Sequence, residues 1–115
     1  MSFHLEVRPA GEVVIVDLKG KLTAGLGDQI LREALDELLA EGKRKILLNL
    51  SEVSFLDSAG VGELVAGLRT AKRFGAELKI LSTSDRVHST LYMARLLPAF
   101  EMYREEALAL EKFGA

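Results

Sequence analysis

One stretch of the chain joins a predicted strand to a predicted helix: Ile46-Leu47-Leu48-Asn49-Leu50-Ser51-Glu52-Val53-Ser54-Phe55-Leu56-Asp57-Ser58-Ala59-Gly60-Val61-Gly62. The apolar run over residues 46–50 has polar residues at both ends, which is typical of a short buried strand. Asp57 and Ser58 are followed by small residues, and either side chain can accept a hydrogen bond from the free amides of a helix's first turn. The stretch therefore predicts a strand and then a helix, with Asp57 or Ser58 as the N-cap.

Segments on both sides continue this alternation of strands and helices. Near the N-terminus an alternating apolar segment and a β-branched run flank a turn that contains Pro9 and Gly11, which predicts a hairpin. Elsewhere apolar residues recur at helical spacing, with Leu26 and Ala94 expected on the buried sides of their helices. The expected strands cover residues 3–8, 13–18, 46–50, 78–81 and 99–103, and the expected helices cover residues 26–39, 61–71, 84–94 and 104–113.

The order of these elements predicts an α/β fold with a mostly parallel sheet of about five strands, an N-terminal hairpin and about four helices. Strands buried between two helical layers are apolar throughout, but Asn49 interrupts one strand and Lys79 alternates with apolar neighbours in another. The helices are therefore expected mainly on one face of the sheet. The opposite face is expected to be partly solvated around Val13, Ile15, Leu47 and Lys79. With 115 residues, the chain is expected to form a single domain over 1–115.

Composition and charge argue against several classes of function. The chain has 15 Lys and Arg residues against 17 Asp and Glu residues, and the net charge of -2 argues against direct binding to nucleic acid. There is no cysteine, and the 2 histidines lie far apart, so no metal site is expected. No apolar run is long enough to span a membrane and no signal peptide is apparent. The protein is therefore expected to be cytoplasmic, without membrane insertion.

No catalytic or cofactor-binding motif emerges from the sequence. Gly25-x-Gly27 and Gly60-x-Gly62 precede helical segments, but neither continues into the dinucleotide-binding pattern. Small residues that allow close helix packing explain these glycines better. Ser58 does not lie in the G-x-S-x-G elbow of a hydrolase nucleophile. The chain is therefore predicted not to be an enzyme, with no cofactor and no metal.

Four segments of the chain together resemble a STAS domain, namely residues 18–23, 46–60, 75–81 and 100–108. The Asp57-Ser58-Ala59-Gly60 motif is fairly specific for this family when it follows an apolar strand. Within the family, the chain is most similar to the stand-alone anti-sigma factor antagonists of bacteria. This resemblance implies the STAS fold and the binding of an anti-sigma factor that is also a serine protein kinase. It also implies a serine phosphatase as a second partner.

The same resemblance implies that Ser58 is the phosphorylated residue, with Asp57 beside it and Gly60 and Gly62 shaping the helix start. Many relatives have a second serine where this chain has Ala59, so Ser58 is the only hydroxyl in the motif. In the family the unphosphorylated form binds the anti-sigma factor and frees the sigma factor. A phosphate at a helix N-terminus is favourable for the fold but costly inside an interface. Such a switch would therefore end binding and leave folding intact.

The docking surface is expected at the carboxyl ends of the parallel strands, where α/β folds place their binding loops. Residues 23–25 follow one strand, and Asp57 and Ser58 follow the next. Residues 23–26 and 58–62 should therefore form the core of one patch, with residues 82–84 at its rim. The plainer alternative is that these are ordinary loops whose composition reflects turn chemistry. The predicted partner-binding residues are Thr23, Ala24, Gly25, Asp57, Ser58, Ala59, Gly60 and Gly62.

Two other functions stay open at this point. A STAS domain can also be an accessory subunit of a membrane transporter for lipids or anions, which would need no phosphorylation. An enzyme of flavodoxin-like outline is the other alternative, although the sequence lacks a phosphate-binding cradle for it.

Overall fold

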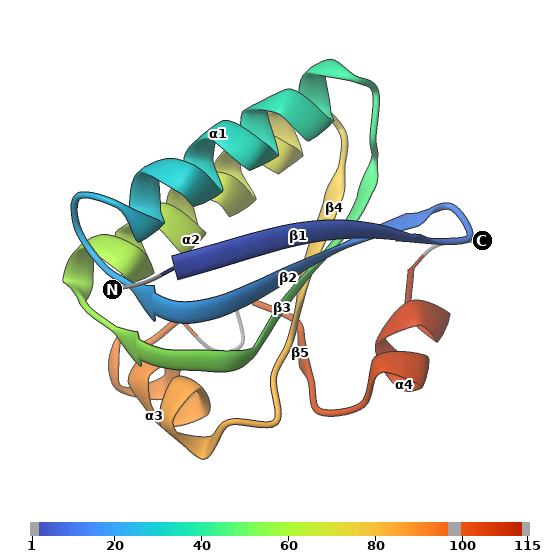
Figure 1. The fold of residues 1–115 in the computed structure, drawn as a ribbon. Helices are drawn as coiled ribbons and strands as arrows, with labels where there is room; N and C mark the ends of the chain where they lie inside the picture. The colour runs from blue at the N-terminus through green and yellow to red at the C-terminus, as the bar shows by residue number, and fades with distance from the viewer. Residues whose placement is uncertain (1–2, 97–99, 114–115) are drawn as a thin grey trace.

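A computed structural model of the chain describes residues 3–96 and 100–113. Its elements alternate as expected, beginning with two strands and ending with a short helix (Figure 1). In chain order they are β1 (Phe3–Ala10), β2 (Val13–Leu22), α1 (Gly27–Ala40), β3 (Lys45–Leu56), α2 (Ser58–Arg73), β4 (Glu77–Leu81), α3 (Asp85–Met93), β5 (Met102–Tyr103) and α4 (Glu106–Glu111).

The strands form one sheet in the order β1-β2-β3-β4-β5, so neighbours in the sheet are also neighbours along the chain. β1 and β2 are an antiparallel hairpin, and the remaining pairs are parallel. Gly11 makes the hairpin turn with a φ of 64°, in the left-handed region that glycine tolerates. The predicted α/β class, with a mostly parallel sheet and an N-terminal hairpin, is confirmed.

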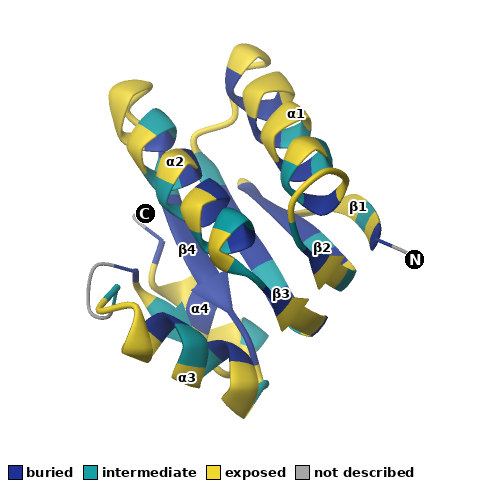
Figure 2. Cartoon of the chain, turned by 90° about the vertical axis from the view of Figure 1, so that its left-hand side faces the viewer, coloured by how far each residue is buried: buried dark blue, intermediate teal, exposed yellow. Residues whose placement is uncertain are grey.

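The larger core lies between one face of the sheet and the three helices α1, α2 and α3. The side of α1 and of α2 that faces the sheet is buried, and the outer side is exposed (Figure 2). Val16, Leu48 and Ile80 point into this core from three strands, and Leu31 and Leu64 meet them from α1 and α2. Burying one such side chain contributes about 1.5–3 kcal/mol, so this layer is the main source of hydrophobic stabilisation.

The short helix α4 packs on the opposite face of the sheet and forms a second, smaller core, whose buried members are Val13, Ile15, Leu47, Leu81, Ala109 and Phe113. The expectation of a partly solvated face around Val13, Ile15, Leu47 and Lys79 is therefore wrong, because all four residues are buried. The part of this face away from α4 is exposed and carries charged side chains. In the described part of the chain, three helices lie on one face and one on the other, which agrees with the prediction of helices mainly on one face.

Charged side chains hold α4 against the sheet. Arg8 forms ion pairs with Asp17 at 2.6 Å and with Glu106 of α4 at 2.7 Å. Lys79 is only 4% exposed, but its ammonium pairs with Glu101 at 2.6 Å and lies 5.3 Å from the ring centre of Phe113. A buried lysine is tolerated when it is paired in this way. The polar position in β4 thus marks a contact under α4 and not a solvated surface.

β3 is longer than predicted. It continues past Leu50 to Leu56 because its second half pairs with β2, for example through Leu22 and Leu56. Ser51 and Ser54 interrupt the apolar pattern here, which is why the sequence indicated an earlier end. This extension carries the end of β3, and the motif that follows it, beyond the end of β4.

Several predicted element ends also differ from the structure. Leu26 and Ala94 were expected to be buried, and both predictions are wrong. Leu26 precedes α1 as its N-cap and is 53% exposed, and Ala94 is the exposed C-cap of α3. α4 is shorter than residues 104–113, and β5 begins later than position 99, which itself lies outside the described residues.

Candidate partner-binding site at the start of α2

Helix α2 begins at the predicted motif, and its N-cap is Asp57. The backbone of Asp57 is extended (φ -97°, ψ -176°), and its Oδ1 accepts a hydrogen bond from the amide of Gly60 at 2.8 Å. The amide of Val61 donates to the carbonyl oxygen of Asp57 at 2.9 Å, as the first bond of the helix. Of the two candidate caps, the aspartate is therefore the one used, and Ser58 becomes the first helical residue.

The second carboxylate oxygen of Asp57 reaches the other predicted segment. Its Oδ2 accepts a hydrogen bond from the amide of Ala24 at 3.1 Å. The loop is also fixed from its other side, because the amide of Gly25 donates to Oδ1 of Asp28 at 3.0 Å. Gly25 has a φ of 99°, so a side chain at this position would strain the backbone. The structure thus brings residues 23–25 together with the start of α2.

These hydrogen bonds keep Asp57 ionised. The amides of Gly60 and Ala24 hold the pKa of the Asp57 carboxyl below its usual value, because they stabilise the charged form. The first turn of α2 itself contains no acidic residue. The site therefore combines the positive end of a helix dipole with one fixed negative charge at the cap.

Ser58 is exposed at the first position of α2. Within residues 3–96 and 100–113, its hydroxyl has no hydrogen-bond partner. A kinase could therefore reach this oxygen without first breaking a contact. A phosphate added here would lie close to the free amides of the first helical turn.

Gly60 and Gly62 have different surroundings. A Cβ on Gly60 would lie 2.1 Å from the carbonyl oxygen of Leu22, so α2 can approach the end of β2 this closely only with glycine at that position. A Cβ on Gly62 would meet nothing within 4 Å, and this residue is exposed. Ala59 is half-buried. Gly60 therefore fixes the helix start by close packing, whereas Gly62 leaves open surface near Ser58.

Two exposed apolar side chains lie at these segments. The sequence placed Leu26 at the end of the expected patch but did not single out Phe55 for binding. Phe55, one residue before the end of β3, is 47% exposed, and Leu26, which follows the 23–25 loop, is 53% exposed. Large apolar side chains at the surface are candidate contact points for another protein. The exposure of Phe55 could have been predicted from strand geometry. Successive side chains of a strand point to opposite faces, so the neighbour of the core-facing Leu56 points away from the main core.

The third predicted loop, residues 82–84, lies elsewhere. The amide of Thr83 donates to Oγ of Ser51 at 3.1 Å, and Ser51 stands near the middle of β3. β4 pairs with β3 only as far as Asn49, so the loop after β4 falls well short of Asp57. The structure thus links this loop to the middle of β3 and not to the start of α2.

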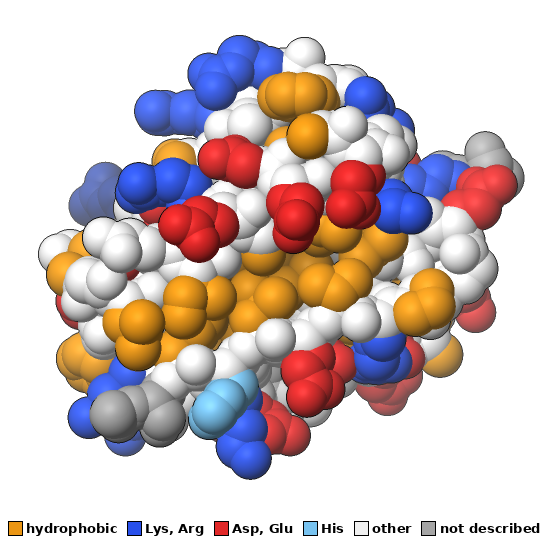
Figure 3. Space-filling model, turned by 45° about the horizontal axis from the view of Figure 1, so that its top comes forward, with side chains coloured by type: hydrophobic (Ala, Val, Ile, Leu, Met, Phe, Trp, Pro, Cys, Tyr) orange, Lys and Arg blue, Asp and Glu red, His pale blue; other side chains and the backbone are white. Residues whose placement is uncertain are grey.

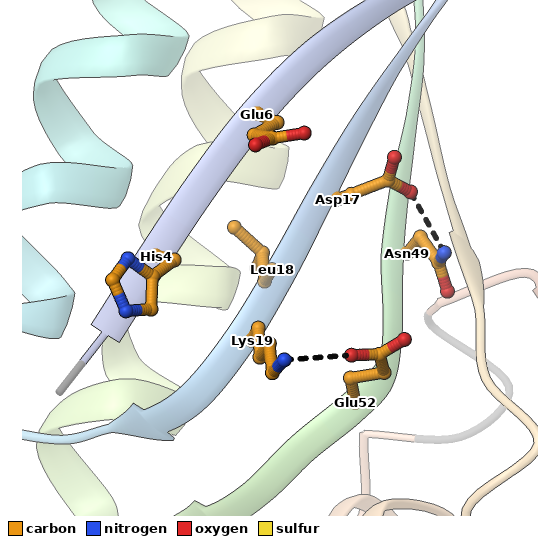
Figure 4. Close-up of a pocket in the computed structure, with 7 residues that line it drawn as sticks. All are labelled: His4, Glu6, Asp17, Leu18, Lys19, Asn49 and Glu52. Carbon is orange, nitrogen blue, oxygen red and sulfur yellow. Dashed lines mark hydrogen bonds and ion pairs between the residues drawn. The ribbon is translucent and has the colours of Figure 1, made fainter.

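A separate hollow of about 490 Å³ lies over β1, β2 and β3 on the exposed part of the sheet face that α4 leaves open (Figure 4). It is lined by His4, Glu6, Asp17, Leu18, Lys19, Asn49 and Glu52. Asn49 donates to Asp17 at 2.8 Å and Lys19 lies 3.9 Å from Glu52, so polar groups of the lining pair with one another. The predicted site residues do not line this hollow.

Two further findings concern only the part of the chain that the structure describes. No three His, Cys, Asp or Glu side chains are grouped there so that they could hold a metal ion. None of the helices described is both long and apolar enough to cross a lipid bilayer.

The fold and the site define a small α/β domain with a hairpin-led sheet and an exposed serine that opens the helix after the third strand. The chain belongs to the STAS domain family, whose family model matches residues 4–109. A Paenibacillus polymyxa protein named anti-sigma F factor antagonist is 28% identical over 111 residues, which cover 96% of this chain and 94% of that protein. A Staphylococcus aureus protein (strain NCTC 8325 / PS 47) named anti-sigma-B factor antagonist is 40% identical over 87 residues, or 76% of this chain and 80% of that protein.

A solved structure shares the fold. The Bacillus cell fate determinant SpoIIAA in the phosphorylated form matches with a TM-score of 0.71 and 23% sequence identity. The match covers 96% of this chain and 98% of that chain. The STAS fold expected from the sequence is therefore confirmed.

Proposed function

We propose that this protein is an anti-sigma factor antagonist whose binding is switched by phosphorylation of Ser58. In the proposed cycle, the unphosphorylated protein binds an anti-sigma factor that is also a serine kinase, and the sigma factor is released. The kinase then phosphorylates Ser58 and the complex dissociates, until a serine phosphatase restores the first state. The names of the two similar proteins support the binding role, and the phosphorylated SpoIIAA supports a phosphate on this fold.

The observation that carries the proposal is the position of Ser58. It is an exposed hydroxyl at the first position of α2, next to the ionised Asp57 and close to the open surface at Gly62. Small residues around it would let the backbone of another protein approach closely. Leu26 and Phe55 would add apolar contacts at the sides of this patch. The proposed partner-binding residues are Thr23, Ala24, Gly25, Asp57, Ser58, Ala59, Gly60 and Gly62.

Phosphorylation would change the charge of this patch more than the stability of the fold. A phosphate adds a charge of about -1.5 to -2 and three acceptor oxygens. At a helix N-terminus such a charge is favourable by about 0.3–1 kcal/mol. Inside an interface the same dianion would be buried beside another negative charge without a cationic partner, which costs far more. Binding is therefore expected to be lost while the protein stays folded.

A phosphorylation assay tests this proposal. The protein is incubated with a purified anti-sigma factor of the kinase type and Mg-ATP, and the modified residue is mapped by mass spectrometry. We expect a single phosphate on Ser58 and none on the Ser58→Ala variant. Ser54→Ala removes another exposed hydroxyl, from β3, and is the matched control that should be phosphorylated like the parent. A phosphate on Ser51 or Ser54 would overturn the assignment.

A further inference from the structure

The outer edge of β1 is long and unprotected. β1 has 8 residues and, among the strands that the structure describes, pairs only with β2, whereas β5 at the other edge of the sheet has 2 residues. Natural sheets block such edges with proline, bulges or a covering element, because unpaired backbone groups are a template for another strand. Pro9 stands near the end of β1, and the register with β2 is regular from Phe3 to Ala10. Most of this edge is therefore available for pairing.

An apolar band runs along this edge, between β1 and α1. Leu5 and the 48% exposed Val7 contribute to it from β1, and the half-buried Ile30 and Ala34 contribute from α1. Figure 3 shows hydrophobic side chains gathered in a band that is hollowed in its middle, below a row of acidic side chains. A contiguous apolar surface rimmed by charged groups is typical of a protein-binding site.

The acidic row has a regular spacing along α1. Glu33, Glu37 and Glu41 are each exposed and four residues apart, and within the described residues none of their carboxylates has an ion pair or hydrogen bond. Like charges at this spacing disfavour a helix, and Glu41 also follows a last turn that contains no basic residue. A partner that supplies cations would remove this unfavourable interaction.

We propose that the edge of β1 binds an extended segment of another protein as a sixth strand, with lysine or arginine at alternate positions facing α1. Four residues of a helix rise about 6 Å, and two residues of a strand advance about 6.6–6.8 Å. The spacing of alternate side chains on an added strand therefore nearly matches the spacing of the three glutamates along α1. Their aliphatic stems would cover the apolar band while their charged ends reach the acidic row.

A second copy of this chain does not fit the same edge. Pairing of β1 with β1 of another copy would bring two rows of Glu33, Glu37 and Glu41 to one interface, and like charges in an interface are repulsive. The occupant is therefore a basic segment of a different protein. This surface contains none of the residues proposed for the Ser58 switch, so the two proposals stand independently.

Titration with a synthetic peptide in which lysine and threonine alternate tests the inference. The isotope-labelled full chain is followed by NMR, and we expect saturable binding with slowed amide exchange along β1. A peptide in which glutamate replaces each lysine should not bind. Glu37→Lys should weaken binding of the lysine peptide at least threefold. Glu111→Lys makes the same charge change on an exposed position of α4 and should stay within twofold of the parent.

Each of the other outcomes would overturn the proposal. The proposal is rejected if binding of the lysine peptide does not saturate, or if the lysine peptide binds no more tightly than the glutamate peptide. It is also rejected if Glu37→Lys and Glu111→Lys weaken binding of the lysine peptide equally. Binding that leaves the exchange of the β1 amides unchanged would also reject an added strand. Ser58→Asp should leave the affinity for the peptide within twofold of the parent. The result therefore does not depend on whether the phosphorylation switch exists.

Discussion

The carboxylate of Asp57 accepts a hydrogen bond from the backbone amide of Ala24, a residue 33 positions earlier in the chain, at 3.1 Å. The other oxygen of the same carboxylate holds the amide of Gly60 in the first turn of α2. One side chain thus sets the relative position of two segments of the candidate site. Its removal should disturb both segments at once.

Replacing Asp57 by alanine should destabilise the protein and loosen the loop at residues 23–25. The substitution removes a helix cap and the contact to Ala24, so we expect the thermal midpoint to fall by several degrees. In amide exchange, Ala24 and Gly60 should exchange faster. Ser58→Ala changes the next residue without touching either hydrogen bond, and its melting should match the parent. Unchanged exchange at Ala24 in Asp57→Ala would contradict this role of the carboxylate.

Acid should weaken the fold through four carboxylates, Asp17, Asp57, Glu101 and Glu106. In the folded protein the pKa of each is lowered, and the largest cause is a hydrogen bond. Arg8 donates it to Asp17 and to Glu106, the amide of Gly60 donates it to Asp57, and Lys79 donates it to Glu101.

A lowered folded pKa contributes stability that is present above the unfolded value, about 4, and is lost as the pH falls through the folded value. The free energy of unfolding should therefore hold near neutral pH and decline below about pH 4. Urea unfolding at a series of pH values measures this. Asp57→Asn should make the decline shallower, and an unchanged slope would show that Asp57 is not involved.

Alanine at the two glycines of the motif should have opposite effects on stability. Gly60→Ala forces a Cβ to within 2.1 Å of the Leu22 carbonyl oxygen, so a backbone must shift, at a cost of about 1–3 kcal/mol. Gly62→Ala adds a methyl group in open space on a helix, which should stabilise the protein by about 0.5–1 kcal/mol. Denaturant unfolding compares the two. Equal tolerance of both variants would mean that α2 can move away from β2 at little cost.

A negative charge at position 58 should weaken binding of the anti-sigma factor. We expect Ser58→Asp to fold normally and to bind at least tenfold more weakly than the parent, a difference of about 1.4 kcal/mol. Ser58→Ala should bind like the parent, because little volume changes. Calorimetry with the purified anti-sigma factor measures both. Binding of the aspartate variant at parental affinity would show that charge is not the switch.

Bulk at Gly62 tests where the partner docks. Gly62→Arg places a long side chain on exposed surface near Ser58, so we expect weaker partner binding with a melting temperature within a few degrees of the parent. Gly25→Arg is unsuitable for the same purpose, because Gly25 needs a φ of 99° and the loop itself would be strained. Full binding by Gly62→Arg would place the interface elsewhere.

Much of the fold could be predicted because the spacing of apolar residues and the positions of turn-forming residues indicate the same element boundaries. The hairpin around Gly11 and the helix start at residues 57–58 depend on local chemistry, so both were predicted from neighbouring residues. The sequence left Asp57 and Ser58 as alternative caps, and the structure selects Asp57. β3 was predicted too short because its second half is held by pairing with β2, which overrides the polar residues Ser51 and Ser54. Pairing of this kind is tertiary and leaves only a weak pattern in a single strand.

The position of Lys79 shows a second limit of prediction from sequence periodicity. A polar residue that alternates with apolar ones predicts a solvated face, yet Lys79 is covered by α4 and paired with Glu101. That partner is 22 positions away, and no periodic pattern connects them. The candidate site also depends on a contact between residues that are far apart in the sequence. Because binding loops lie at the carboxyl ends of parallel strands, residues 23–25 and Ser58 were predicted to lie close together. The hydrogen bond from the amide of Ala24 to Asp57, which holds them together, is seen only in the structure.

The order of the strands in the sheet repeats their order in the chain, and this has a consequence for biosynthesis. No strand has to enter between two that have already paired, so each new strand can add to the free edge as it leaves the ribosome. The antiparallel β1–β2 hairpin also closes a short loop, which favours its early formation. A nascent chain that ends after α2 already holds the β1–β2 hairpin, β3 and two of the covering helices. The start of α2 can therefore take its shape before β4, α3 and α4 have been made, and protease resistance of ribosome-bound chains of increasing length would reveal this order.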